Sequence, residues 1–211
     1  MIIYNYIDKL VSAIKNDVVS GLSGFHTNLN FSDELIAQDV VDERLQIIKE
    51  YSLKGIMPLK DLYISINCIK VDCKNIEKCH CGMSDEEPVA HFEIPQLLND
   101  YGNLSIDYLG STDRQLPFVF YTSSTAFRYH KYRKRGKNKP YVWIDTTPNE
   151  NGMNDCFVFN APFIDNVSIT AIFKDLRQLS NYECCLPDDN MTFINNEIKK
   201  RVTEKKIRYY R

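Results

Sequence analysis

Residues 32–66 read SDELIAQDVVDERLQIIKEYSLKGIMPLKDLYISI, and this stretch decides the fold class because its pattern of apolar residues changes part-way along. Its first part, residues 33–52, predicts a helix, since apolar side chains recur there at helical spacing. Ser32 can cap this helix, and Gly55 can end it. The residues that form its broad apolar face are Leu35, Ile36, Val40, Val41, Leu45, Ile47 and Ile48.

The pattern changes after Pro58. Leu62, Ile64 and Ile66 alternate there with polar neighbours, as in a half-buried strand. The cysteine-bearing residues 67–87 come next and are expected to be mostly loop. Short runs rich in aromatic and β-branched residues follow, separated by Gly, Pro and Asn, and they predict a small, mostly antiparallel sheet. These runs are Phe92–Ile94, Leu104–Leu109, Phe118–Thr122, Phe127–Tyr132, Tyr141–Asp145, Cys156–Phe159 and Val167–Phe173.

Helices are expected at both ends of the chain. Residues 4–19 carry apolar side chains at helical spacing, and Asp188 or Asp189 can cap a final helix that begins near Met191. The predicted fold class is therefore α+β: N-terminal helices packed on a small, mostly antiparallel sheet, with a long basic β-hairpin and a C-terminal helix.

This order of elements predicts one α+β domain over residues 1–187, followed by a basic C-terminal helix over residues 188–211. Within the domain we expect a helical part (1–57) and a β-rich part (58–187). No apolar run reaches the roughly 18 residues that a membrane span needs, so no membrane segment is expected. Residues 1–11 contain neither a basic leader nor a small-residue cleavage site, so we expect no signal peptide.

The net charge of −2 conceals two basic segments. Residues 128–139 hold seven basic residues and no acid, and residues 199–211 hold seven basic residues and one acid, Glu204. The rest of the chain has 12 basic and 27 acidic residues, so charges of +13 and −15 are separated along the sequence. Such separation is typical of contact with a polyanion or with an acidic surface of another copy, and two solvated faces are the alternative.

Residues 128–140 predict a β-hairpin with a basic loop, because Gly136 lies near its tip and Pro140 at its exit. Its interleaved tyrosines and bases could stack on nucleic-acid bases and neutralise phosphates, although ordinary strand alternation explains much of the pattern. The third possibility is contact with an acidic face of a neighbouring copy. The candidate contact residues in the two basic segments are Arg128, Lys131, Arg133, Lys134, Arg135, Lys137, Lys139, Lys199, Lys200, Arg201, Lys205, Lys206 and Arg208.

Four cysteines lie close together in the sequence, beside His80 and His91, and are candidate zinc ligands: Cys68, Cys73, Cys79 and Cys81. Their spacing, C-x4-C-x5-C-x-C, lacks the paired C-x2-C motifs of a typical zinc site. Buried thiols without a ligand role and disulfides are the alternatives. We therefore expect no cofactor, with zinc as the open alternative.

Catalytic motifs are missing from the sequence. There is no G-x-S-x-G elbow, no H-E-x-x-H and no Gly-rich phosphate loop. Asp107 and Asp113 flank a turn at Gly110–Ser111, and turn chemistry explains them better than catalysis. We therefore name no catalytic residue and do not expect an enzyme.

Four stretches resemble virion structural proteins of crAss-like bacteriophages, in particular the ring (collar or connector) proteins between portal and tail. The stretches span most of residues 60–211. They are the cysteine segment with 92–98; 108–114 with 117–118; 129–142 with 149–151 and 159–162; and 173–179 with 184–185 and 203–211.

The resemblance implies a structural protein that forms a homo-oligomeric ring under the portal, around the channel through which DNA leaves. Such a ring matches the portal's rotational symmetry, commonly twelvefold. Its partners would be further copies of itself, the portal, other connector or tail proteins, and passing genomic DNA without sequence-specific contact; no membrane is involved. The protein would assemble in the bacterial host cytoplasm and reside in the virion. A nucleic-acid-binding module with a structural zinc is the alternative function.

Overall fold

The computed structural model describes residues 2–22, 32–54, 62–74, 89–100, 103–123, 125–126, 139–160, 164–182, 185–186 and 192–210. The chain forms two compact units. The helical unit comprises Met1–Tyr63, Lys174–Asn181 and Leu186–Arg211. The β unit comprises Ile64–Phe173 and Tyr182–Cys185. The predicted α+β class is confirmed, and the C-terminal helix groups with the N-terminal helices in this division.

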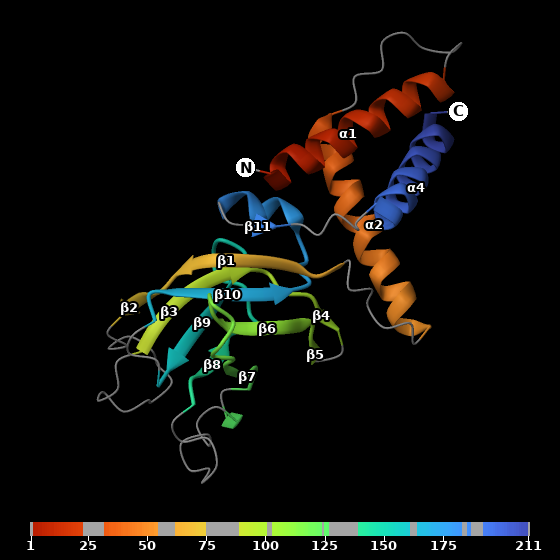
Figure 1. Cartoon of the computed structure of the whole chain (residues 1–211). Helices are drawn as coiled ribbons and strands as arrows, with labels where there is room; N and C mark the ends of the chain where they lie inside the picture. Colours follow the sequence, from red (N-terminus) through yellow and green to blue (C-terminus); the bar gives the residue numbers. More distant parts are fainter. Residues whose placement is uncertain are drawn as a thin grey trace. The chain divides into compact units, whose positions relative to one another are not determined.

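The helical unit contains α1 (Ile2–Gly21), α2 (Asp33–Leu53), the 3-10 helix η2 (Leu176–Asn181) and α4 (Thr192–Tyr210). Helix α4 packs against both α1 and α2 (Figure 1). The apolar face predicted for α1 is confirmed, because Ile7, Leu10, Val11, Ile14 and Val18 are all buried. The core of the unit is completed by Ile36, Val40, Val41, Ile47, Ile48, Leu176, Leu179, Ile198 and Val202.

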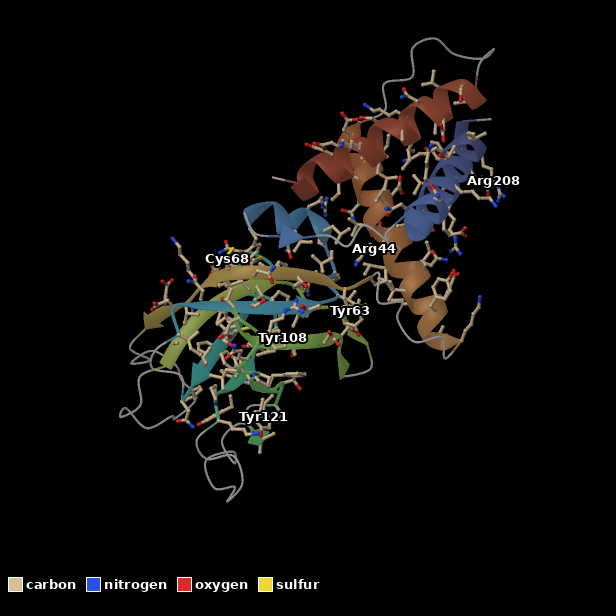
Figure 2. The ribbon with its side chains drawn as sticks, viewed as in Figure 1. Arg44, Tyr63, Cys68, Tyr108, Tyr121 and Arg208 are labelled. Atoms are coloured by element: carbon tan, nitrogen blue, oxygen red, sulfur yellow. The ribbon has the colours of Figure 1, made fainter. Side chains whose placement is uncertain are left out.

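One residue of α2 lies away from the face predicted for it, and one residue that was not predicted lies within that face. Leu35 is 63% exposed, because it is one position before Ile36 and therefore points away from the buried face. Arg44 is only 1% exposed, because it follows Val40 by four residues and precedes Ile48 by four. Its spacing places it in the middle of the buried face (Figure 2).

The β unit contains two main sheets. The first has the order β11-β1-β10-β6, and the second has the order β2-β3-β9-β8-β7 (Figure 1). A short third sheet pairs β4 (Asn99–Asp100) with β5 (Asn103–Leu104). The strands of the first sheet are β11 (Cys185–Leu186), β1 (Ile64–Lys70), β10 (Asn166–Ala171) and β6 (Ile106–Ser111). Those of the second are β2 (Asp72–Lys74), β3 (Val89–Pro95), β9 (Met153–Phe159), β8 (Tyr141–Ile144) and β7 (Val119–Tyr121).

Alternate residues of both sheets build the core of the β unit. Strand β1 alternates in this way, as the period-two pattern after Pro58 predicts, whereas β8 and most of β10 are buried at every position and β7 has no buried residue. The chain changes sheet at Val71, between β1 and β2, and again in the turn between β6 and β7. The main core residues are Ile64, Ile66, Phe92, Ile94, Val142, Ile144, Cys156, Val158, Ile169 and Ala171.

The sheets are mostly antiparallel, as predicted, with one parallel pair next to the basic segment in the sequence. Every described register in the two main sheets is antiparallel except that of β7 with β8, which is parallel. Parallel neighbours cannot be joined by a tight hairpin turn, because the chain must return along the strand before it pairs again. The hairpin predicted at 128–140 lies almost wholly outside the described residues, of which Lys139 and Pro140 are part.

Candidate functional site

The predicted cysteine ligands are only partly described. Cys68 lies on β1, is half-buried and takes part in a disulfide, so it presents no thiolate to a metal in this state. Cys73 lies on β2, with only its backbone described, and Cys79 and Cys81 fall outside the described residues. The zinc hypothesis for this segment therefore stays a prediction that no longer includes Cys68. Cys156 is a free thiol on β9, and complete burial together with the charge of Asp155 raises its pKa.

The basic residues of α4 are largely paired within the helical unit. Arg201 donates to both oxygens of Glu50, at 3.0 and 2.9 Å, and to Glu197 at 2.9 Å. Lys206 lies 2.5 Å from the Asp39 carboxylate, and Lys205 donates to the same residue at 3.2 Å. The remaining pairs are Lys199 with Asp17, Lys205 with Glu43, and Arg208 with Glu204.

These ion pairs shift the titration of their members. Burial would raise the pKa of Asp39, but hydrogen bonds from Lys206 and Lys205 outweigh it and lower that pKa. The hydrogen bond from Arg201 lowers the pKa of Glu50 in the same way. The hydrogen bond to Asp39 raises the pKa of Lys205. Most of the α4 bases predicted to contact a partner are thus paired within the chain: Lys199, Arg201, Lys205, Lys206 and Arg208.

Charge is distributed differently in the two units. The helical unit has 15 basic and 14 acidic residues, so its charge is nearly balanced. The β unit, outside residues 128–139, has 14 acidic residues against four basic ones, and the seven bases of that segment are inserted into it. Of the segment's candidate contact residues, only Lys139 is described, and it is exposed. The charge separation seen in the sequence is therefore a property of the β unit.

An exposed apolar patch adjoins the strand that leads into the basic segment. Strand β7 is at the end of its sheet, and Val119 and Phe120 on it are 38% and 37% exposed. Leu116, in the turn that precedes the strand, is 42% exposed. We call these three exposed apolar residues at the sheet edge, Leu116, Val119 and Phe120, the edge patch; Val119 and Phe120 are successive strand residues and so point to opposite sides of the sheet. An edge strand with exposed apolar side chains is a surface at which another chain can pair.

A second cluster lies on the other side of the same sheet from the core residues Phe92 and Ile94. His91 and Glu93 are alternate residues of β3 and share that side, and Asp155 lies opposite Glu93 on β9. The Nε2 atom of His91 lies 2.8 Å from Oδ1 of Asp155, and one ligand atom from each of the three residues lies within 4.8 Å of the others. His91 is 6% exposed, whereas both carboxylates are half-buried.

Asn149 connects this cluster to the turn between β8 and β9. Its Oδ1 accepts hydrogen bonds from the backbone nitrogens of Asn151 and Met153, both at 3.0 Å, and so shapes the turn. Gly152 in this turn has a positive φ of 73°, which glycine adopts readily. The Nδ2 atom of Asn149 donates to Glu93 at 3.4 Å and to Asp155 at 3.5 Å. The turn therefore presents an amide to both carboxylates.

Aromatic rings border the cluster. The ring of Phe157 lies 5.1 Å from the rings of both His91 and Trp143, and Tyr141 stacks on Phe159. These contacts hold the imidazole of His91 in place. From the sequence, His91 is a candidate only as a neighbour of the cysteines. Glu93 and Asp155 are not predicted as site residues. The His-x-Glu alternation on a strand was the available signal, but the partner on β9 depends on strand pairing.

Asp113 performs the turn role that its position predicted. Its Oδ1 accepts hydrogen bonds from the hydroxyl of Ser111 and, at 3.1 Å, from the backbone nitrogen of Gln115. These hydrogen bonds lower its pKa.

Comparison with known proteins identifies no relative. No protein-family description matches the sequence, and no curated protein matches it. No helix among the described residues is long and apolar enough to cross a membrane.

Proposed function

We propose that this chain is a structural subunit of a tailed-bacteriophage connector, forming a homo-oligomeric ring below the portal around the DNA channel. The proposed class of protein rests on the sequence resemblance to ring proteins of crAss-like bacteriophages. The stretches that carry the resemblance include the residues of β3, β6, β8 and η2, which are framework elements. If the two kinds of protein share a structural role, we expect their similarity to lie in such framework residues.

The observation that carries the proposal is the edge patch, on the strand that precedes the basic segment in the sequence, within an otherwise acidic β unit. A closed ring needs two different faces on each subunit, so that one face meets the other face of the next copy. Opposite charges within one unit can orient such head-to-tail contacts, and buried apolar area supplies most of their affinity. The occupant of the edge patch is, on this view, a second copy of the chain.

The basic segment then has a protein contact and not a DNA contact. A channel that passes a genome should bind DNA weakly, since phosphate contacts by many bases would retard passage. The candidate contact residues narrow accordingly to the edge patch and residues 128–139, because the bases of α4 are largely paired within the helical unit.

Light scattering coupled to size exclusion tests the assembly. We expect the wild-type chain, alone or with portal, to form one species of defined mass well above 24.6 kDa. The double variant Val119→Ser, Phe120→Ser should remain monomeric because it removes apolar area from the contact. The matched control Leu35→Ser, Leu53→Ser changes two exposed apolar residues of the helical unit and should assemble normally.

A wild-type chain that stays monomeric at all concentrations and never joins portal or virion would overturn the proposal. Tight DNA binding that weakens steeply with salt, together with one equivalent of zinc, would instead favour the nucleic-acid-binding alternative.

A further inference from the structure

We propose that His91, Glu93 and Asp155 bind a divalent transition-metal ion, with Zn²⁺ as the best fit, on the side of the second sheet opposite its core. This site is distinct from the cysteine segment considered in the sequence. It does not depend on the ring that we propose above.

The donor set suits such an ion. It offers one imidazole nitrogen and two carboxylates, which are ligands that Zn²⁺ takes at about 2.0–2.2 Å. A tetrahedral ion at that range separates its ligand atoms by roughly 3.4 Å. The present separations extend from 2.8 Å between His91 and Asp155 to at most 4.8 Å, so they bracket the required value. Small rotations of the two half-buried carboxylates would bring all three ligand atoms to one ion.

Electrostatics favours a cation at this place. Glu93 and Asp155 are directly opposite each other on neighbouring antiparallel strands, an arrangement in which like charges repel. Asp72 on β2 lies opposite His91 and adds a third carboxylate to the same side of the sheet. The hydrogen bonds from Asn149 to the two carboxylates are long, at 3.4 and 3.5 Å, and neutral. A divalent ion would compensate the charge that an amide leaves uncompensated.

The surroundings already hold the least mobile ligand in position. His91 is buried and lies against the ring of Phe157, which in turn stacks on Trp143. Asn149, fixed by its own turn, reaches both carboxylates and acts as a positioning residue for them. Two sides of the site are thus preorganised, and the exposed side of the carboxylates leaves a route for the ion.

Calorimetric titration of ZnCl2 into the full-length chain, stripped with a chelator and without reductant so that Cys68 stays in its disulfide, tests the site. The double variant Glu93→Gln, Asp155→Asn keeps the shapes of both side chains and should bind at least tenfold more weakly at this site. Glu150→Gln, which changes an exposed carboxylate in the adjacent turn, is the matched control and should bind like the wild type. Thermal melts of each variant should show zinc stabilising only the chains that bind it.

A second variant separates this site from the cysteines. Cys79→Ser, Cys81→Ser should leave one zinc bound with nitrogen and oxygen ligands, which the absorption spectrum of the Co²⁺-substituted protein distinguishes from thiolate ligands. The proposal is overturned if zinc is lost in the cysteine variant and kept in the carboxylate variant. It is equally overturned if a folded wild-type chain binds no zinc at micromolar concentration.

Discussion

Gly110 lies where the chain passes from β6 in the first sheet to β7 in the second. It lies on β6, just before the turn that leads to β7, and the backbone nitrogen of Phe118 returns to the carbonyl oxygen of Leu109 at 2.8 Å. A Cβ atom at Gly110 would lie 2.6 Å from the hydroxyl oxygen of Tyr108 and would collide with the carbonyl oxygen of Leu116. The turn packs on this strand only because the position has no side chain.

We therefore expect Gly110→Ala to lower the free energy of unfolding by about 1–3 kcal/mol, because a backbone oxygen cannot move aside as a side chain can. Urea denaturation followed by circular dichroism measures the change. Gly21→Ala is the matched control, since its Cβ would meet only the flexible end of Ile207 and should cost clearly less. Equal losses in the two variants would show that the packing of the turn is not the cause.

For single residues, the sequence predicts burial correctly where the spacing along a helix alone determines it. The helical period predicts the five residues of α1 that are buried among those whose side chains are described, and the same period, applied to every position of α2, would have found Arg44 between Val40 and Ile48. The need for glycine at position 110 could not be predicted in this way. It arises from Leu116, which the turn brings back across the strand.

Helix α4 shows how one element neutralises others that are distant in the sequence. Its bases meet the acids of α1 and α2, more than 150 residues away along the chain in every pair between these helices. Such pairs contribute little each when exposed, but Asp39 is mostly shielded from solvent and has two lysine partners. Asp39 is therefore the acid at which the packing of α4 should be most sensitive to pH.

The pKa of Asp39 is lowered in the folded chain, so its contribution to stability is present above its unfolded pKa and is lost as pH falls through the folded value. We expect Asp39→Asn to cost roughly 1 kcal/mol at pH 7. The variant should also lose less stability than the wild type as the pH falls through and below 3.8, the ordinary pKa of an aspartate, because the wild-type carboxylate must then be protonated against its lysine partners. Denaturation at a series of pH values checks both effects.

Asp8→Asn, on the exposed side of α1, is the control and should follow the wild-type pH profile. If the stability of Asp39→Asn falls at low pH as much as that of the wild type, then the pairs of this carboxylate with the lysines of α4 do not stabilise the fold.

The sequence predicts the positions of these elements well and their pairing poorly. The predicted helix 33–52 agrees with α2, and the predicted run Tyr141–Asp145 agrees with β8. Residues 67–70 and 72–74 are strands, however, where mostly loop was expected. The separation into two sheets and the parallel pair β7–β8 arise from contacts between distant strands, which local periodicity does not encode. The His91 cluster was missed for the same reason.

At the scale of the whole molecule, the two units differ in how they carry charge. The helical unit is almost balanced and paired, and the β unit combines acidic surface with the basic residues 128–139. On the ring that we propose, association should therefore depend on charges of the β unit.

We expect assembly to weaken as salt rises from about 0.05 to 0.5 M, because the screening length then falls severalfold. Sedimentation at both salt concentrations should show roughly a tenfold rise in the protein concentration at half-assembly. The variant Arg133→Gln, Lys134→Gln, Arg135→Gln should show a weaker salt dependence, whereas Lys200→Gln on α4 should behave like the wild type. Assembly that is insensitive to salt in the wild type would contradict the assignment of charge to the contact.

The helical unit is built from three separate stretches of chain, and nearly all of the β unit is inserted between α2 and α4. During synthesis on the ribosome, α1 and α2 therefore emerge long before the helix that covers them. The β unit emerges as one almost continuous stretch and can fold in the meantime. Until α4 leaves the ribosome, the apolar faces of α1 and α2 and the acids that α4 pairs remain without their final partner. We expect the helical unit to be the last part of a newly made chain to become resistant to protease.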